Sequence, residues 1–307
     1  MTEMKHFSKK TLLVICGVAV AFLLGVLAII VNYTLRVTRL ENDMKQVAIM
    51  ASEQVANELE ACRDIARTLG FVEALSDDTV SITEKSDILQ QWAIDHDVDR
   101  CRVIDSDGVG LDDGLIYTDR AYYQAALRGE TLISEPVVSK ITGKATFVVS
   151  APLYKGDEIV GCVYVVPYEG FFSRLMYTAG TTNIKEMDDR SSAYMIDKMG
   201  NIIAAPNMEI VKQGEPLTDG VNSGFDSVLA IRKKMMAGET GFGSYESHGQ
   251  RMIAGYSPVE NTDGWSLMVF SSQSNFVSDI CKSSIVIIII VTSLSLVFVA
   301  FIRKHIK

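Results

Sequence analysis

Histidine and cysteine, the residues that often carry metal sites and nucleophilic catalysis, are scarce in this chain of 307 residues. None of the histidines stands at a spacing that chelates zinc; they are His6, His96, His248 and His305. No Gly-x-Ser-x-Gly elbow, phosphate-binding loop or His-Glu-x-x-His motif occurs. The sequence therefore predicts no catalytic residues, no metal ligands and no cofactor, and an enzyme is the least favoured class.

The five cysteines form no dense framework, and their number is odd. Cys101 and Cys162 both fall on predicted strands, and they would lie side by side if those strands pair in that register. Because nothing else indicates a disulfide scaffold, we expect unpaired thiols rather than a structural disulfide.

A run of acidic residues, 105–113, resembles a calcium-binding loop but lacks two of its ligands. The fifth position is Val109 and the twelfth is Ile116, where an oxygen ligand and a bidentate glutamate are needed. A turn explains the run better, since Asp, Ser and Gly are the usual turn residues.

Long apolar runs are present twice, and only near the ends of the chain. Residues 12–31 and 285–302 carry no charge and are long enough to cross a bilayer. Their outer flanks are basic, with Lys5, Lys9, Lys10, Arg303, Lys304 and Lys307. Because Lys and Arg collect on cytoplasmic flanks, we expect transmembrane helices at 12–32 and 285–302, cytoplasmic ends at 1–11 and 303–307, and residues 33–284 outside.

Cleavage of the first run as a signal peptide is less favoured. A small-x-small pattern at residues 19–21 lies inside the apolar run, whereas cleavage normally follows such a run. We therefore predict an uncleaved anchor.

Acidic residues exceed basic ones, 38 to 29. Removing the six basic flank residues and Glu3 leaves 37 against 23, so the outside portion has a net charge near −14. This charge argues against nucleic acid and anionic lipid as its partners.

A helical stripe follows the first apolar run. Apolar residues recur at steps of three and four from Leu40 to Leu69, and Gly70 stands where the helix is expected to end. The sequence predicts one long helix over 33–70. Its stripe could face its own globular body, a second copy of the helix, or one at each end, and docking on its own domain is the favoured interpretation.

Four short patterns recur in the same order in two halves of the middle region. They are residues 101–105 with 194–200, 129–131 with 238–240, 151–152 with 257–258, and 161–166 with 264–269. This order predicts one sheet-plus-helix unit occurring twice. In the first copy, strands over 145–153 and 159–166, joined by 154–158, predict a hairpin and hence an antiparallel sheet.

At this point the chain resembles the double Cache (dCache) sensor domains of bacterial chemoreceptors, sensor kinases and diguanylate cyclases. The matching segments are residues 119–129, 134–138 with 142–144, 151–152 and 161–165, within a resemblance that covers roughly residues 35–280. It implies an α+β fold in which a long N-terminal helix precedes two PAS-like lobes with antiparallel sheets, flanked by two transmembrane helices. The lobes are expected at 71–180, far from the membrane, and at 181–276, near it.

The resemblance also implies a ligand site in the first lobe. Arg120, followed by Tyr122 and Tyr123, matches the family pattern that holds a ligand carboxylate, with Tyr117 and Asp119 as neighbours. Guanidinium and phenol groups suit a carboxylate because they supply aligned donors and an apolar wall. The alternative is that this cluster caps a surface helix, stacks there, or pairs with Asp119 at the surface.

The family's amino-acid sensors add groups that are not evident here. The acidic residue that holds a ligand ammonium aligns with Val166, and a further polar pair is replaced by Val137 and Ser139. The sequence therefore favours a carboxylate or other small organic ligand over a standard α-amino acid.

These features predict an extracellular small-molecule sensor in a bacterial plasma membrane. It would pass a conformational change across the membrane, with a possible homodimer through the long helix. Only five residues follow 302, so the output is expected from a longer receptor (a cyclase, kinase or chemoreceptor) or from a signalling partner. A surface ligand-binding protein without signalling is the remaining alternative.

Overall fold

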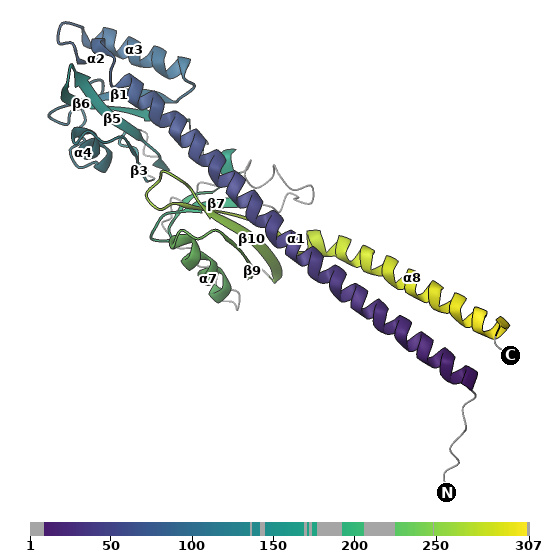
Figure 1. Cartoon of the computed structure of the whole chain (residues 1–307). Coiled ribbons are helices and arrows are strands. Elements are labelled where there is room, and N and C mark those ends of the chain that lie inside the picture. Colours follow the sequence, from purple (N-terminus) through teal and green to yellow (C-terminus); the bar gives the residue numbers. More distant parts are fainter. Residues whose placement is uncertain are drawn as a thin grey trace. The chain divides into compact units, whose positions relative to one another are not determined.

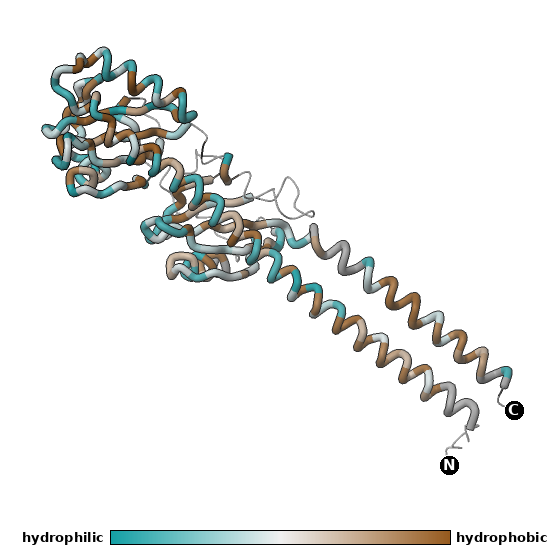
Figure 2. The backbone as a smooth tube through the Cα atoms, turned by 45° about the horizontal axis from the view of Figure 1, so that its top comes forward, coloured by the Kyte–Doolittle hydropathy of each residue, from teal (hydrophilic) through white to brown (hydrophobic). Residues whose placement is uncertain are grey.

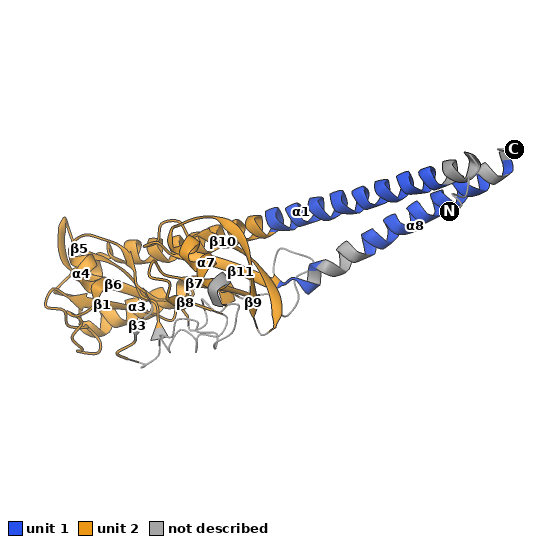
Figure 3. Cartoon of the chain, turned by 90° about the horizontal axis from the view of Figure 1, so that it is seen from below, with its two compact units in different colours: residues 1–43, 272–307 blue, residues 44–271 orange. Residues whose placement is uncertain are grey.

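The computed structural model describes residues 9–135, 137–141, 145–168, 171, 174–176, 192–205, 225–247 and 249–305. Several predicted features lie outside these residues: most of the N-terminal tail, residues 142–144, the lobe boundary at 180–181, His6 and His248. The described chain divides into two compact units, residues 1–43 with 272–307 and residues 44–271 (Figure 3).

Helix α1 (Lys9–Leu69) joins the first apolar run and the striped segment in one continuous element of 61 residues. No proline interrupts it, because the first proline of the chain is residue 136. It ends where predicted, with the Gly70 amide donating to the Ala66 carbonyl at 3.0 Å. A side chain at Gly70 would meet the Pro152 carbonyl oxygen at 2.1 Å, so glycine permits the close approach.

Helix α8 (Ser274–His305) is the last helix in the described part of the chain. Two helical segments are long and apolar enough to cross a membrane, Ile15–Leu69 and Lys282–Phe301. Figure 2 shows hydrophobic colouring along α8 and along the part of α1 toward the N-terminus. Within this unit the helices pack at glycines, since a Cβ on Gly17 would lie 2.1 Å from the Phe298 ring. Small residues let helix backbones approach in this way in membranes.

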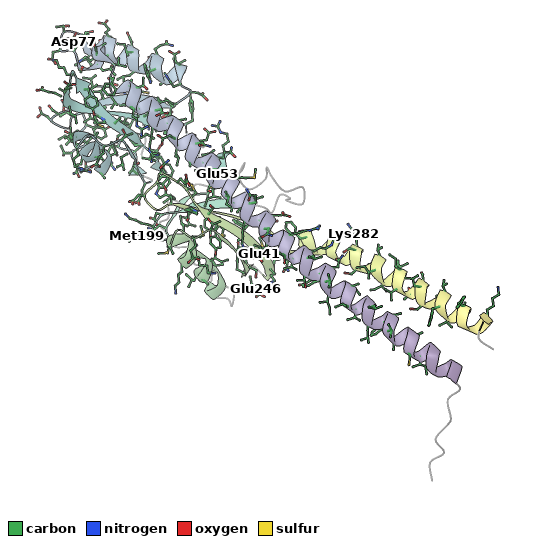
Figure 4. The ribbon with its side chains drawn as sticks, viewed as in Figure 1. Glu41, Glu53, Asp77, Met199, Glu246 and Lys282 are labelled. Atoms are coloured by element: carbon green, nitrogen blue, oxygen red, sulfur yellow. The ribbon has the colours of Figure 1, made fainter. Side chains whose placement is uncertain are left out.

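The first sheet has the strand order β1-β6-β5-β2, and its three strand pairs are antiparallel, as expected. Its strands are β1 (Arg100–Asp105), β2 (Leu132–Ile133), β5 (Val149–Lys155) and β6 (Glu158–Val166). Helices α2 (Glu73–Ser76), α3 (Ile82–Asp95) and α4 (Ala121–Leu127) accompany it, and Asp77 between α2 and α3 is labelled in Figure 4. Two short strands, β3 (Val137–Val138) and β4 (Ala145–Thr146), form a separate two-stranded sheet.

The predicted hairpin is present, but its turn is shorter than the predicted 154–158. The strands reach Lys155 and Glu158, so only Gly156 and Asp157 connect them. Gly156 has φ +62°, the conformation that two-residue hairpin turns require. The start also differs, because residues 145–146 form β4 and pair with β3 instead of extending β5.

The second sheet has the order β8-β7-β11-β10-β9. Its elements are β7 (Ser192–Ile196), β8 (Ile202–Ala204), helix α7 (Phe225–Met236), β9 (Gly241–Ser247), β10 (Gln250–Pro258) and β11 (Ser266–Ser272). The run β7-β11-β10-β9 repeats the order β1-β6-β5-β2 of the first sheet. The predicted duplication is therefore present in the topology.

The duplication extends to individual hydrogen bonds. Asp105, the last residue of β1, accepts from the amides of residues two and four further on, and Asp197, directly after β7, does the same. The exposed Met199 of the second turn is labelled in Figure 4. Gly129 after α4 and Gly238 after α7 both have positive φ and close matching Schellman caps.

One predicted correspondence is out of register. The sequence match aligned Gly161 with Gly264, which aligns Cys162 with Trp265. Strand pairing instead matches Cys162, opposite Ile104, with Ser266, opposite Ile196. The shift matters because one residue along a strand moves a side chain to the other face of the sheet.

The buried stripe of α1 packs on its own globular unit. One hydrophobic core joins seven α1 residues, from Val47 to Leu69, to buried residues of both sheets. Figure 1 shows α1 running along both sheets, with α4 and α7 away from it. The ring of Phe147 meets Trp265 edge-on at 5.9 Å, which joins the first lobe to the second within this core. The interpretation that the stripe docks on its own domain is confirmed.

Cys101 and Cys162 lie on paired strands but on opposite faces of the sheet. Cys101 stands opposite Val165 and belongs to the core beside α1, whereas Cys162 stands opposite Ile104 on the α4 side. Both are free and buried, and burial raises the pKa of the Cys101 thiol to about 12. The expected unpaired thiols are therefore found, and these two are poor nucleophiles.

Candidate functional site

A pocket lies on the α4 side of the first sheet. Its lining comes from β1, the segment before α4, α4 itself, the β3–β4 region and β6: Arg100, Tyr117, Arg120, Tyr122, Val137, Ser139, Lys140, Ile141, Thr146, Val148, Tyr164 and Val166. Among these described residues three are cationic and none is acidic. The open volume is about 20 Å³, room for about one water molecule, so this conformation is narrow.

Arg120 lines this pocket from the N-cap position of α4. Its backbone is extended, with φ −89° and ψ 126°, and its side chain makes no cap hydrogen bond. Of the contacts that the surface alternative predicted, the cap is therefore not made, whereas the pairing with Asp119 is. The Nε atom lies 3.8 Å from a carboxylate oxygen of Asp119, and the side chain is 21 % exposed. Arg120 thus reaches both the pocket and its acidic neighbour.

Three tyrosines form the wall beside Arg120. The Tyr164 ring lies 6.1 Å from that of Tyr117 and 5.8 Å from that of Tyr122. Burial raises the pKa of all three phenols. They therefore keep their protons at neutral pH and can donate hydrogen bonds. The Tyr117 hydroxyl donates to an Asp113 carboxylate oxygen at 2.8 Å.

Two predicted site residues lie outside the pocket lining. Tyr123 is buried, and its hydroxyl donates to the Ser106 carbonyl at 2.9 Å. Successive residues of a helix point about 100° apart, so Tyr122 and Tyr123 face different surroundings. The Asp119 side chain is 63 % exposed and accepts a hydrogen bond from Lys140 at 2.6 Å. That bond is the main cause of the lowered pKa of Asp119.

Arg100, Lys140 and Tyr164 line the pocket but were missed in the sequence. Arg100 stands four residues before Ile104 on β1, hence on the same face of the sheet, and pairs with Asp99 at 2.9 Å. Alternation along β1 would have placed Arg100 on the pocket side. Nothing in the sequence marks Lys140, which comes from a separate loop. Val137, Ser139 and Val166, where the resemblance implied polar groups, all line the pocket.

Three of the four carboxylates of residues 105–113 accept from protein donors, those of Asp105, Asp112 and Asp113. Asp105 accepts from two backbone amides, and Asp113 accepts from the Leu115 amide as well as from Tyr117. Asp112 pairs with Arg102 and accepts from Ser86. No cluster of metal-ligating side chains is found among the described residues. The run is a turn, as the sequence indicated.

The family model dCache_1, a Cache domain, matches residues 34–280. The chain belongs to the dCache family. This agrees with the predicted resemblance in both its identity and its extent. The long leading helix, the two antiparallel sheets and the apolar helices at both ends are the fold that the resemblance implied.

Solved structures show the same dCache fold at low identity. The sensory domain of the Campylobacter jejuni chemoreceptor Tlp3, solved with L-norvaline, is 15 % identical with a TM-score of 0.59; the match covers 79 % of this chain and 94 % of that one. The Pseudomonas aeruginosa amino-acid chemoreceptor PctB, solved with L-Arg, is 18 % identical with a TM-score of 0.58, covering 79 % and 92 %. Pseudomonas fluorescens CtaA, solved with L-alanine, is 14 % identical with a TM-score of 0.57, covering 77 % and 98 %. No curated protein matches.

Proposed function

We propose that this dCache protein is a membrane-anchored extracellular sensor that binds a small organic carboxylate. Its spans are residues 12–32 and 285–302, with both termini in the cytoplasm of a bacterium and residues 33–284 outside. The basic flanks of both apolar runs support this topology. The ligand-binding lobe is residues 71–180, and residues 181–276 form the lobe next to the membrane.

The observation that carries the proposal is the pocket that joins Arg120 to Tyr117 and Tyr122. The Arg120 guanidinium offers two parallel donors to a carboxylate, and the Tyr122 phenol can add a donor; Tyr117, whose hydroxyl donates to Asp113, supplies ring surface to the wall. Tyr164 completes that wall. In this proposal Tyr123 supports α4 from its far side, and Asp119 acts through its contacts with Arg120 and Lys140.

Binding would produce a signal because the described pocket is narrow. A carboxylate ligand needs more than the present 20 Å³, so it must favour a wider arrangement of the pocket walls. A ligand shifts such an equilibrium only by its different affinity for the two arrangements. Helix α1 contacts both lobes and continues into the first span, so it offers a stiff path toward the membrane.

The output then depends on what receives the change at the cytoplasmic side. The similar Tlp3 and PctB structures are chemoreceptor domains, which favours the sensory portion of a chemoreceptor or a partner of that kind. A cyclase or kinase reading frame immediately downstream would favour those outputs instead. The predicted homodimer rested on the apolar stripe of α1, which from Val47 to Leu69 is buried on its own lobes, so a homodimer would have to use another face of this helix. Crosslinking in membranes tests this.

The direct test uses the full chain purified in detergent. A panel of small organic acids is screened for ligands that raise the melting temperature, and each hit is repeated with Arg120→Ala. We expect the stabilisation to be lost, because the charged donor pair is removed. Arg128→Ala is the matched control, since Arg128 pairs only with exposed Glu130 in the described structure. A hit that survives Arg120→Ala contradicts the proposed pocket.

Transmission has a separate test. Cysteine pairs placed on the two spans are crosslinked with and without the ligand. An unchanged crosslinking pattern alongside intact binding would support the alternative of a surface binding protein without signalling.

A further inference from the structure

The ammonium group of Lys140 already occupies a place suited to a ligand ammonium. Its Nζ atom donates to the Ile116 carbonyl at 2.5 Å and to an Asp119 carboxylate oxygen at 2.6 Å. It also lies 5.4 Å from the centre of the Tyr117 ring. A carboxylate, a carbonyl and an aromatic face are the three kinds of group that hold an alkylammonium in proteins.

These acceptors are therefore taken by the chain itself. Lys140 comes from the segment after β3 and lines the pocket together with Tyr117, whereas Ile116 and Asp119, which precede α4, lie just outside the lining. The contacts of Lys140 therefore lie at the edge of the pocket. An α-amino acid bound here would bring a second ammonium next to the first. Two like charges at that separation repel, which disfavours such a ligand.

The remaining polar lining offers donors. Arg100 and Arg120 both line the cavity, and no described lining residue is acidic. Asp113 accepts from Tyr117, and Asp99 pairs with only one Arg100 nitrogen, Nη1, whereas the buried Nε of Arg100 has no hydrogen-bond partner in the described part of the chain. A ligand with one carboxylate would satisfy Arg120 alone. A second acidic group would use Arg100 as well.

We propose that Lys140 and Arg100 set the ligand class of this site: a small molecule with two acidic groups and no ammonium. Lys140 excludes the ammonium by filling its place, and Arg100 receives the second acidic group. This inference rests on the proposed function, in which Arg120 holds the first carboxylate.

Three four-carbon probes separate these possibilities: succinate with two carboxylates, butyrate with one, and L-2-aminobutyrate with a carboxylate and an ammonium. Their binding to the full chain in detergent is measured by calorimetry. We expect succinate to bind at least about ten-fold more tightly than either other probe, because its second carboxylate adds roughly one charge-assisted contact.

Two variants test the two roles. Arg100→Gln is expected to reduce succinate affinity to the level of butyrate and to leave butyrate unchanged. Lys140→Met keeps the apolar stem but frees Asp119 and the Ile116 carbonyl, so L-2-aminobutyrate should bind at least about five-fold more tightly. The controls are Arg128→Gln and Lys155→Met; Lys155 also makes a 2.6 Å contact with an aspartate, Asp78, but does not line the pocket.

The outcomes distinguish this inference from the proposed function. Tighter binding of L-2-aminobutyrate than of succinate by the unaltered chain overturns the ligand class. If Arg120→Ala still abolishes that binding, the carboxylate site stands. A succinate preference that persists in Arg100→Gln removes the second anchor, and unchanged L-2-aminobutyrate binding in Lys140→Met removes the role of Lys140. Failure to bind any of the three also overturns the inference, whereas an Arg120-dependent hit among other organic acids would leave the proposed function intact.

Discussion

The two lobes share one scaffold but fill it differently. Both have the same order of four strands, the same aspartate turn after the first strand and the same glycine cap after the helix. In the first lobe the space between helix and sheet is lined by tyrosines and cations. In the second lobe it holds a buried cluster in which three tyrosines, Tyr194, Tyr245 and Tyr256, pack with Ile231, Met235, Met252 and Met268.

Equivalent positions show where the difference arises. The pairing registers match Tyr164 with Met268 and Arg100 with Ser192, and the shared glycine caps match Tyr122 with Ile231. The opposite face of each sheet packs on α1 in both lobes and is apolar in both. The duplicated unit therefore retains one face for assembly, while the face under the short helix can become either a pocket or a core.

The largest expected effect concerns the shared core. Trp265 is buried and touches Phe147 of the other lobe, so Trp265→Ala should lower the free energy of unfolding by about 3–5 kcal/mol. Denaturant unfolding should remain a single transition, since both lobes pack on one core. Half-buried Trp92 is the control, with a smaller loss on Trp92→Ala. Two separated transitions would show that the lobes unfold independently.

Replacing the aspartate should lower the free energy of unfolding more in one of the two turns than in the other. Asp197 is 2 % exposed and accepts from the amides of Met199 and Asn201, so Asp197→Ala should lose about 1–3 kcal/mol because those amides lose their partner. Asp105 makes equivalent bonds but is exposed, so water replaces the lost acceptor and Asp105→Ala should cost less. Asp197→Asn keeps an acceptor oxygen and should recover part of the loss. Equal losses for the two alanine variants, measured by denaturation, would contradict the role of burial.

A substitution that gives the first lobe a residue of the second should reduce ligand affinity more than it reduces the free energy of unfolding. Tyr164→Met introduces the residue found at the equivalent position, and we expect ligand affinity to fall about ten-fold through the lost donor and ring wall. Calorimetry with an Arg120-dependent ligand measures this. Tyr194→Phe in the second lobe, which removes the hydroxyl near Met268, should leave affinity unchanged. A similar loss from both variants would mean that the second lobe shares the site.

The smallest effect is a pH dependence at the junction of the lobes. Burial, followed by the nearby carboxylates of Asp197 and Asp263, raises the pKa of Glu135 above its ordinary value of 4.5, against the attraction of Lys198. A raised folded-state pKa makes the ionised glutamate destabilising, and this cost grows as the pH rises through that folded-state value. Glu135→Gln should therefore melt at a slightly higher temperature at neutral pH, and the advantage should vanish below pH 4.5. An advantage that is constant across the pH range would contradict this.

The sequence by itself determined the features that repeat locally. The apolar runs, the stripe of α1 and its end at Gly70 follow from periods of 3.6 residues and a single glycine. The duplication was visible because turns and caps depend on a few residues such as Asp105 and Gly129. Arg120 was found through its resemblance to the family pattern, and it does line a pocket.

Only the tertiary structure decided which side chains meet. It brings Arg100, Arg120 and Lys140 to one cavity from three separate segments, and it separates the adjacent Tyr122 and Tyr123. It also corrected the alignment at Cys162 by one residue, which reverses the face. The physical reason is that local periodicity fixes the direction of a side chain within its own element, whereas contacts between distant segments depend on strand register and on how the elements pack.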